Sequence, residues 1–194
     1  MEKIQIFLDY ANINRGANDL GYRLDYEELL HSHLASQNEG RTLIDAFAYV
    51  PIDPRQEHRM DNAIDALWNA GYFVNSKVGT IAGESYKCDF DVEIAMDIIK
   101  IAHQTKPDII ILASGDSDFI PIIKELRKMG IRVEVASFKE ITSHKVASVA
   151  SGFIDLEYFF QENSEPENDL VEEEKLTEAS VLEETEKLSI KKDQ

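Results

Sequence analysis

Apolar and polar positions follow one another along the chain in an order that predicts strands and helices in turn. Short runs rich in Ile, Val and Phe are typical of strands, and longer stretches with apolar residues three and four apart are typical of helices. Strands are expected at residues 3–9, 42–50, 72–78, 108–113, 131–136 and 153–156. Helices are expected at residues 24–34, 53–70, 91–103, 117–129 and 143–150, with a loop at 79–87. This order predicts an α/β domain, a parallel sheet covered by helices on both faces.

Capping residues mark the ends of the predicted helix at residues 53–70. Asp53 followed by Pro54 suits an N-cap and a first helical position, and Gly71 suits the C-terminus. The inner stripe of this helix is expected to hold Met60, Ile64, Leu67 and Trp68. The first strand, by contrast, runs into polar residues 10–14, where no helix is evident.

Carboxylates stand directly after two of the predicted strands. Asp9 ends the first strand, and Asp116 and Asp118 follow the apolar strand that reaches Ala113. Asp91 begins the helix that precedes that strand. In open α/β sheets the binding crevice lies beyond the carboxyl ends of the strands, where the strand order reverses. We therefore expect these side chains to meet at one edge of the sheet.

A cluster of this kind has a limited chemistry. Two carboxylates about 5 Å apart repel by roughly 3 kcal/mol at an effective dielectric constant of 20. Such groups take up protons, move apart or hold a cation. Oxygen ligands favour Mg²⁺ or Mn²⁺ over zinc, and a bound Mg²⁺ can activate a phosphodiester for hydrolysis.

Each of these residues also has a structural explanation. Asp116 can cap the helix that follows it, with Asp118 in the first turn beside the helix dipole. Asp91 can be an ordinary acid at a helix N-terminus, and Asn12 a turn residue. Asp9 is the hardest to explain in this way, because it follows a buried strand and caps no evident helix.

Composition sets the domain boundaries. The 194 residues carry a net charge of −17, of which residues 161–194 contribute −8. The expected organisation is one globular domain at residues 1–160 and an acidic, disordered tail at 161–194, with binding of a protein partner as the alternative for the tail. The single cysteine, Cys88, excludes an internal disulfide and a multi-cysteine zinc site. The longest aliphatic run has five residues, where a membrane span needs about 20. No membrane segment or signal peptide is recognised, so a cytoplasmic location is expected.

The acidic balance argues against passive binding of nucleic acid, which needs a basic face. It does not exclude a metal-dependent nuclease. Basic residues do fall near the predicted active end and could contact phosphates: Arg15, Arg55, Arg59, Lys77 and Lys87. A phosphatase of the haloacid dehalogenase type is disfavoured, because Ala11 stands where that chemistry places a second aspartate.

Three segments together resemble a known family. They are Asp9-x-x-Asn12, the stretch from Lys87 to Asp97, and Ser-Gly-Asp-Ser-Asp-Phe at 114–119 with Gly130–Val135 downstream. Over residues 3–157 the chain resembles a LabA-like NYN domain, a branch of the PIN-like nucleases. The resemblance implies a Rossmann-like three-layer sandwich with a five- or six-stranded, mainly parallel sheet.

The resemblance also implies an activity, that of a Mg²⁺- or Mn²⁺-dependent endoribonuclease acting on RNA. Its metal ligands would be Asp9, Asp91 and Asp116, with Asp118 as a further catalytic residue. The residues expected to bind or orient substrate are Asn12, Arg15, Lys87 and Ser114. Two functional classes stay open, the metal-dependent ribonuclease and an RNA-binding or regulatory module that keeps the acidic pocket and cuts little. A homodimer is a further open alternative.

Overall fold

The computed structural model describes residues 1–35, 40–83 and 85–163. By contacts between residues the chain divides into a unit of Met1–Phe159 and a unit of Phe160–Gln194, and the sheet belongs to the first. The acidic tail is expected at residues 161–194. Residues 161–163 end the final helix, and the rest of the tail lies outside the described residues.

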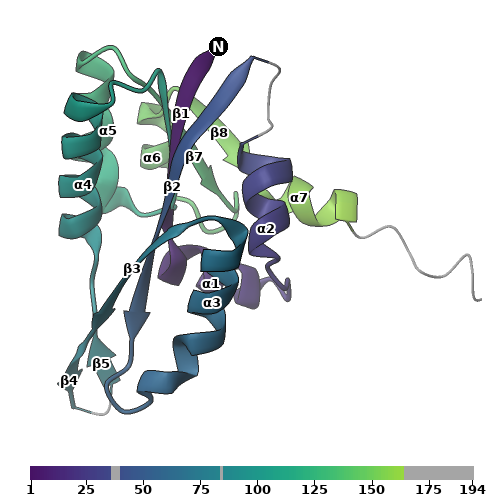
Figure 1. Ribbon diagram of the computed structural model, residues 1–194, viewed down its shortest axis with the longest axis vertical. Coiled ribbons are helices and arrows are strands. Elements are labelled where there is room, and N and C mark those ends of the chain that lie inside the picture. The colour runs from purple at the N-terminus through teal and green to yellow at the C-terminus, as the bar shows by residue number, and fades with distance from the viewer. Residues whose placement is uncertain (36–39, 84, 164–194) are drawn as a thin grey trace, which may run out of the picture. The chain divides into compact units, whose positions relative to one another are not determined.

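Six parallel strands form one sheet (Figure 1). They are β1 (Glu2–Asp9), β2 (Arg41–Ile52), β3 (Phe73–Val78), β6 (Ile109–Ala113), β7 (Arg132–Ser137) and β8 (Gly152–Asp155). Their order across the sheet is β3-β2-β1-β6-β7-β8. The predicted α/β sandwich with a six-stranded sheet is confirmed.

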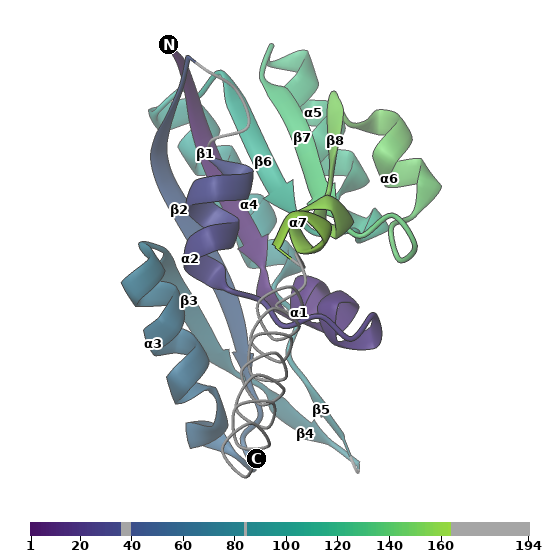
Figure 2. The ribbon, with the colours of Figure 1, turned by 90° about the vertical axis from the view of Figure 1, so that its right-hand side faces the viewer.

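Helices cover both faces of the sheet (Figures 1 and 2). On one face lie α4 (Asp91–Gln104), the 3₁₀ turn η3 (Ser117–Phe119), α5 (Ile120–Lys128) and α6 (His144–Val149). On the other lie α1 (Tyr10–Asp19), α2 (Tyr26–Glu28) with the π-helix η1 (Leu29–Leu34), the 3₁₀ turn η2 (Glu57–Met60) and α3 (Asp61–Ala70). After β8 the chain continues as α7 (Leu156–Asn163). No helix in these described segments is both long and apolar enough to cross a membrane.

The core follows the alternation of side chains along the strands. Every residue of β6 is buried, as expected for a central parallel strand with helices on both sides. On the α4–α5 face, Phe7 and Leu112 pack with Ile94, Ile98 and other apolar residues of the two helices. Burial of these side chains, rather than helix propensity, supplies most of the stability of helices this short.

Four local expectations were wrong. The polar stretch after β1 forms helix α1, and the loop expected at 79–87 is a hairpin of β4 (Thr80–Ala82) and β5 (Ser85–Lys87). The carboxylate of Asp53 binds the backbone and side chain of Arg55 instead of capping a helix, so α3 begins only at Asp61. Trp68 is 58% exposed, because it lies about 100° around the helix from the buried Leu67.

The strand order reverses between β1 and β6. From β1 the chain adds β2 and β3 on one side, and it then returns to add β6, β7 and β8 on the other. Leu8 pairs with Ala113 across the two central strands, so their next residues, Asp9 and Ser114, leave the sheet side by side. The fold therefore opens its crevice where the sequence places the carboxylates.

Candidate active site

Hydrogen bonds join the ends of β1 and β6. Asp9 caps α1, since its Oδ1 accepts a bond from the Asn12 backbone at 3.2 Å. Its Oδ2 accepts a bond from the Ser114 hydroxyl at 3.1 Å. The Asn12 side chain in turn accepts a bond from the Gly115 backbone at 2.9 Å. These bonds fix Asp9 on both sides, and the fully buried Ser114 acts by holding carboxylates in place.

The loop after β6 passes close to its neighbours at Gly115. A Cβ added there would come within 2.8 Å of the Ser137 Oγ and within 3.1 Å of the Thr142 Oγ1. Both contacts are tighter than side chains normally make, so any larger residue would require these side chains or the loop to shift. This close approach lets the Gly115 backbone reach Asn12 and sets the path of the residues that follow.

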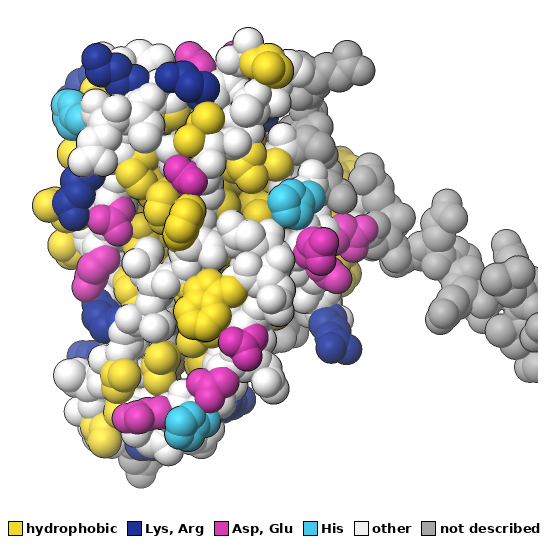
Figure 3. All heavy atoms as spheres, in the orientation of Figure 1, with side chains coloured by type: hydrophobic (Ala, Val, Ile, Leu, Met, Phe, Trp, Pro, Cys, Tyr) yellow, Lys and Arg dark blue, Asp and Glu magenta, His cyan; other side chains and the backbone are white. Residues whose placement is uncertain are grey.

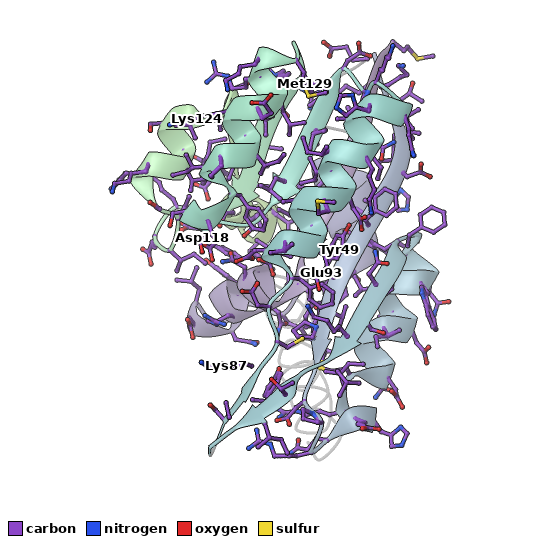
Figure 4. The ribbon with its side chains drawn as sticks, turned by 90° about the vertical axis from the view of Figure 1, so that its left-hand side faces the viewer. Tyr49, Lys87, Glu93, Asp118, Lys124 and Met129 are labelled. Carbon is purple, nitrogen blue, oxygen red and sulfur yellow. The ribbon has the colours of Figure 1, made fainter. Side chains whose placement is uncertain are left out.

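Asp116 and Asp118 lie at the start of the turn that leads into α5. The Asp116 carboxylate accepts a bond from the Asp118 backbone at 3.0 Å, and the Asp116 backbone donates to the Ser114 hydroxyl at 3.3 Å. Asp116 is thus an N-cap, which is the structural role considered for it from the sequence. Its charge also acts on Asp9 and Asp91. The Asp118 side chain is exposed near the N-terminus of α5 (Figure 4).

Asp91 stands at the centre of the negative charge. Partial burial and then the charges of Asp89, Asp116 and Asp9 raise its pKa to about 7. Burial likewise raises the pKa of Asp9, and the charge of Asp116 adds to the shift, although the bonds from Asn12 and Ser114 oppose it. The three aspartates predicted from the sequence therefore act on one another electrostatically, which places them at the same end of the sheet.

Sequence reasoning missed Asp89. Its Oδ1 accepts a bond from the Asp91 backbone at 2.9 Å, and its charge is the largest electrostatic contribution to the raised pKa of Asp91. An aspartate close before a helix start is a common capping signal. The resemblance implied a role as metal ligand for Asp91 and none for Asp89. Asp89 adds a fourth carboxylate to the candidate site.

Lys77, expected as a phosphate contact, has a different role. Its ammonium group donates to the Asp89 carbonyl at 2.5 Å, pairs with the Glu93 carboxylate, and lies 4.7 Å from the centre of the Phe90 ring. Lys77 therefore ties the end of β3 to the first turn of α4. It holds in place the segment that carries Asp89 and Asp91.

The donor atoms of the candidate site are of the type that a hard divalent cation prefers. All are carboxylate oxygens, which Mg²⁺ and Mn²⁺ prefer. Burial and the charges of neighbouring aspartates raise the pKa of both Asp91 and Asp9, and a bound cation would oppose both effects. Within residues 1–35, 40–83 and 85–163, however, no three His, Cys, Asp or Glu side chains lie close enough to form a ready metal cage. Mg²⁺ is usually bound through one or two carboxylates and several waters, so such a cage is not required.

The basic residues divide into near and distant ones. Arg15 is exposed on α1, and its charge acts on Asp9. Lys87 extends from β5, apart from Asp118 and Glu93 (Figure 4), and it is not among the charges that shift Asp9 or Asp91. On the face seen in Figure 3, Lys and Arg side chains are scattered among acidic and apolar ones rather than gathered into one patch.

The raised pKa of Asp91 predicts how stability depends on pH. The folded protein holds this proton up to about pH 7, whereas in the unfolded chain it dissociates near the ordinary value of 3.8. The contribution of Asp91 to stability is therefore complete below about pH 4 and is lost as the pH rises through 7. In melting experiments without metal, Asp91→Asn should gain in melting temperature over the wild type as the pH is raised from 5 to 8. Parallel pH profiles would contradict the clustering of charge.

Comparison with known proteins places the fold and the site in a family. The family model "NYN domain" matches residues 3–157, and the chain belongs to this family. NYN domains are nuclease domains of an RNase-like class. The matched range covers the six strands, apart from the first residue of β1, and the four carboxylates of the candidate site.

Two relatives agree with this assignment. The chain is 27% identical over 175 residues to the "Low amplitude and bright protein LabA" of Synechococcus elongatus, which covers 85% of this chain and 91% of that protein. The crystal structure of a Vibrio parahaemolyticus protein of unknown function superposes with a TM-score of 0.64 and 28% identity, over 80% of this chain and 93% of that chain. The predicted LabA-like NYN domain is thus confirmed.

Proposed function

We propose that this protein is a metal-dependent endoribonuclease that hydrolyses RNA phosphodiester bonds at the cluster of Asp9, Asp91 and Asp116. The observation that carries the proposal is the position of the carboxylates where the strand order reverses: Asp9 and Ser114 leave β1 and β6 side by side and are hydrogen-bonded, and Asp116 follows in the same loop. Burial, and then the charges of Asp89, Asp116 and Asp9, raise the pKa of Asp91 beside them. Such a cluster costs free energy in the folded protein, and binding a cation would offset that cost.

In this proposal, the position of each side chain sets its role. Asp9, Asp91 and Asp116 would hold Mg²⁺ or Mn²⁺, which when bound supplies a Lewis acid and lowers the pKa of an attacking water. Ser114 and Asn12 keep Asp9 and the loop after β6 in register. Asp118 and Asp89 lie beside the ligands, where either can accept a proton from water. Arg15 is placed to contact a phosphate next to the scissile bond.

Divalent cations should stabilise the wild type through these ligands. A ligand that binds only the folded state adds about 2.7 kcal/mol to the free energy of unfolding at a hundredfold excess over its dissociation constant. We expect Mn²⁺ to raise the melting temperature of the wild type and to leave that of Asp9→Asn/Asp116→Asn nearly unchanged. Equal shifts in the two proteins would show that the cation binds at other acidic residues.

The alternative is an RNA-binding or regulatory module that keeps the acidic pocket and cuts little, because the charge of −17 and the scattered basic residues attract an RNA substrate only weakly. Binding and cleavage of one labelled RNA separate the two functions. The ribonuclease should bind RNA in Ca²⁺ or EDTA and cut it in Mg²⁺ or Mn²⁺. Binding in all four conditions without any product would favour the module.

A further inference from the structure

A second feature lies at the same end of the sheet as the carboxylates. It is a groove of about 530 Å³ between α1, the segment from the end of β2 to the start of α3, and the β4–β5 hairpin. These elements lie together at one end of the sheet in Figure 2. α1 begins at the cap Asp9, and Arg15 both lines the groove and acts electrostatically on Asp9. A ligand in the groove would thus extend away from the candidate metal site.

The groove has the side chains that bind nucleotides. Arg15 and Arg59 line it, and the charges of Arg59 and Arg55 act on the Tyr86 hydroxyl. Asp53 also lines it, but its carboxylate is paired with Arg55, with 2.6 Å between Oδ2 and Nη2. The wall also includes three amide side chains, which can read base edges, and one further acid: Asn14, Asn18, Gln56 and Asp19. Arginines beside an aromatic ring and amides are the usual composition of sites for unpaired nucleotides.

The ring of Tyr86 is held in position. Tyr86 pairs with Ile81 across the hairpin, and Gly79 lies against the ring. A Cβ at Gly79 would come within 2.7 Å of the Tyr86 Cδ2, so glycine is what allows the ring to lie so close to the strand. Tyr86 is half-buried, and one edge of its ring lies against Gly79, so the ring forms an aromatic wall of the groove.

We propose that this groove binds one unpaired nucleotide of the RNA strand next to the scissile bond. Its base stacks on Tyr86, and Arg15 and Arg59 contact its phosphates. This proposal rests on the proposed function, because it assumes that RNA is the substrate. It also names the substrate class more closely, because a base inside a duplex is stacked on both faces and has no free face for Tyr86. Cleavage should therefore fall in single-stranded segments.

Binding measured without cleavage tests the groove. The probe is a fluorescent single-stranded oligoribonucleotide, and its anisotropy is followed in EDTA at several salt concentrations. Tyr86→Ala should weaken binding about tenfold, and Tyr86→Phe should bind within twofold of the wild type because the stacking face is kept. Arg59→Gln should weaken binding and reduce the slope of log affinity against log salt by about one.

Matched variants control for general effects. Tyr158 is 61% exposed on α7, and Lys124 is exposed on α5, so Tyr158→Ala and Lys124→Gln should bind as the wild type does. Melting temperatures check that each variant is folded. Wild-type affinity in Tyr86→Ala and Arg59→Gln, or no binding of RNA by the wild type, overturns the groove proposal. If the groove variants lose binding but the wild type never cuts RNA in Mg²⁺ or Mn²⁺, the nucleotide site stands and the ribonuclease proposal fails.

Discussion

Asp116→Asn should abolish RNA cleavage and leave the fold intact. The amide keeps an oxygen to accept the bond from the Asp118 backbone, and it removes one of the charges that repel Asp91 and Asp9. Outer-shell changes at metal sites already cost about 10–100-fold in activity, so loss of a ligand should cost more. Cleavage rates in Mn²⁺ and melting curves without metal measure the two effects.

The matched control is Asp65→Asn, which makes the same change on the exposed side of α3. This variant should cut RNA at the wild-type rate. If Asp116→Asn melts well below the wild type as it loses activity, the residue serves the fold as a cap, and its place in the site is contradicted.

Glu134→Ala should give the largest loss of stability. Glu134 accepts bonds at 3.0 and 2.8 Å from the guanidinium group of Arg41, and both side chains are about 5% exposed. Arg41 lies on β2 and Glu134 on β7, so the pair bridges β1 and β6. Truncating Glu134 leaves the buried Arg41 guanidinium with only the exposed carboxylate of Glu2 at 3.9 Å. Breaking a buried ion pair in this way typically costs about 3–5 kcal/mol. At this chain length the melting temperature should fall by roughly 10 °C.

The double variant Arg41→Met/Glu134→Leu separates the cost of an unpaired charge from lost packing. Replacing a whole buried ion pair with apolar side chains is often close to neutral. The double variant should therefore melt above Glu134→Ala. A single variant that loses less than about 1 kcal/mol would show that solvent reaches Arg41 in solution.

The sheet was predictable because its strands are short apolar runs with few competing interpretations. Ile109–Ala113 is apolar at every position, and it is one of the two central strands of the sheet. Helix α1 was not predictable, since its asparagines and glycine have low helix propensity. It forms because Asp9 caps it and because Ile13 and Ala17 are buried against the rest of the domain. The hairpin was missed because three-residue strands carry no pattern of their own.

The sequence predicted those residues of the site whose positions follow from the order of the strands. Asp9 and Asp116 follow neighbouring strands, and that position alone brings them together. Side chains whose roles depend on contacts distant in sequence were beyond prediction. Lys77 was expected to contact phosphate, and its bond to the Asp89 carbonyl is visible only once the end of β3 lies beside the start of α4. The wall formed by Tyr86 likewise depends on a hairpin that the sequence did not reveal.

Cleavage of a labelled single-stranded RNA by the purified wild type, across a Mn²⁺ titration and in EDTA, tests the central claim most directly. The double variant Asp9→Asn/Asp116→Asn, purified in parallel, shows any contaminating nuclease. We expect the wild-type rate to rise to a plateau with Mn²⁺, to vanish in EDTA, and to be absent from the double variant at every concentration. Cleavage that persists in EDTA, or that the double variant retains, would contradict a ribonuclease built on these carboxylates.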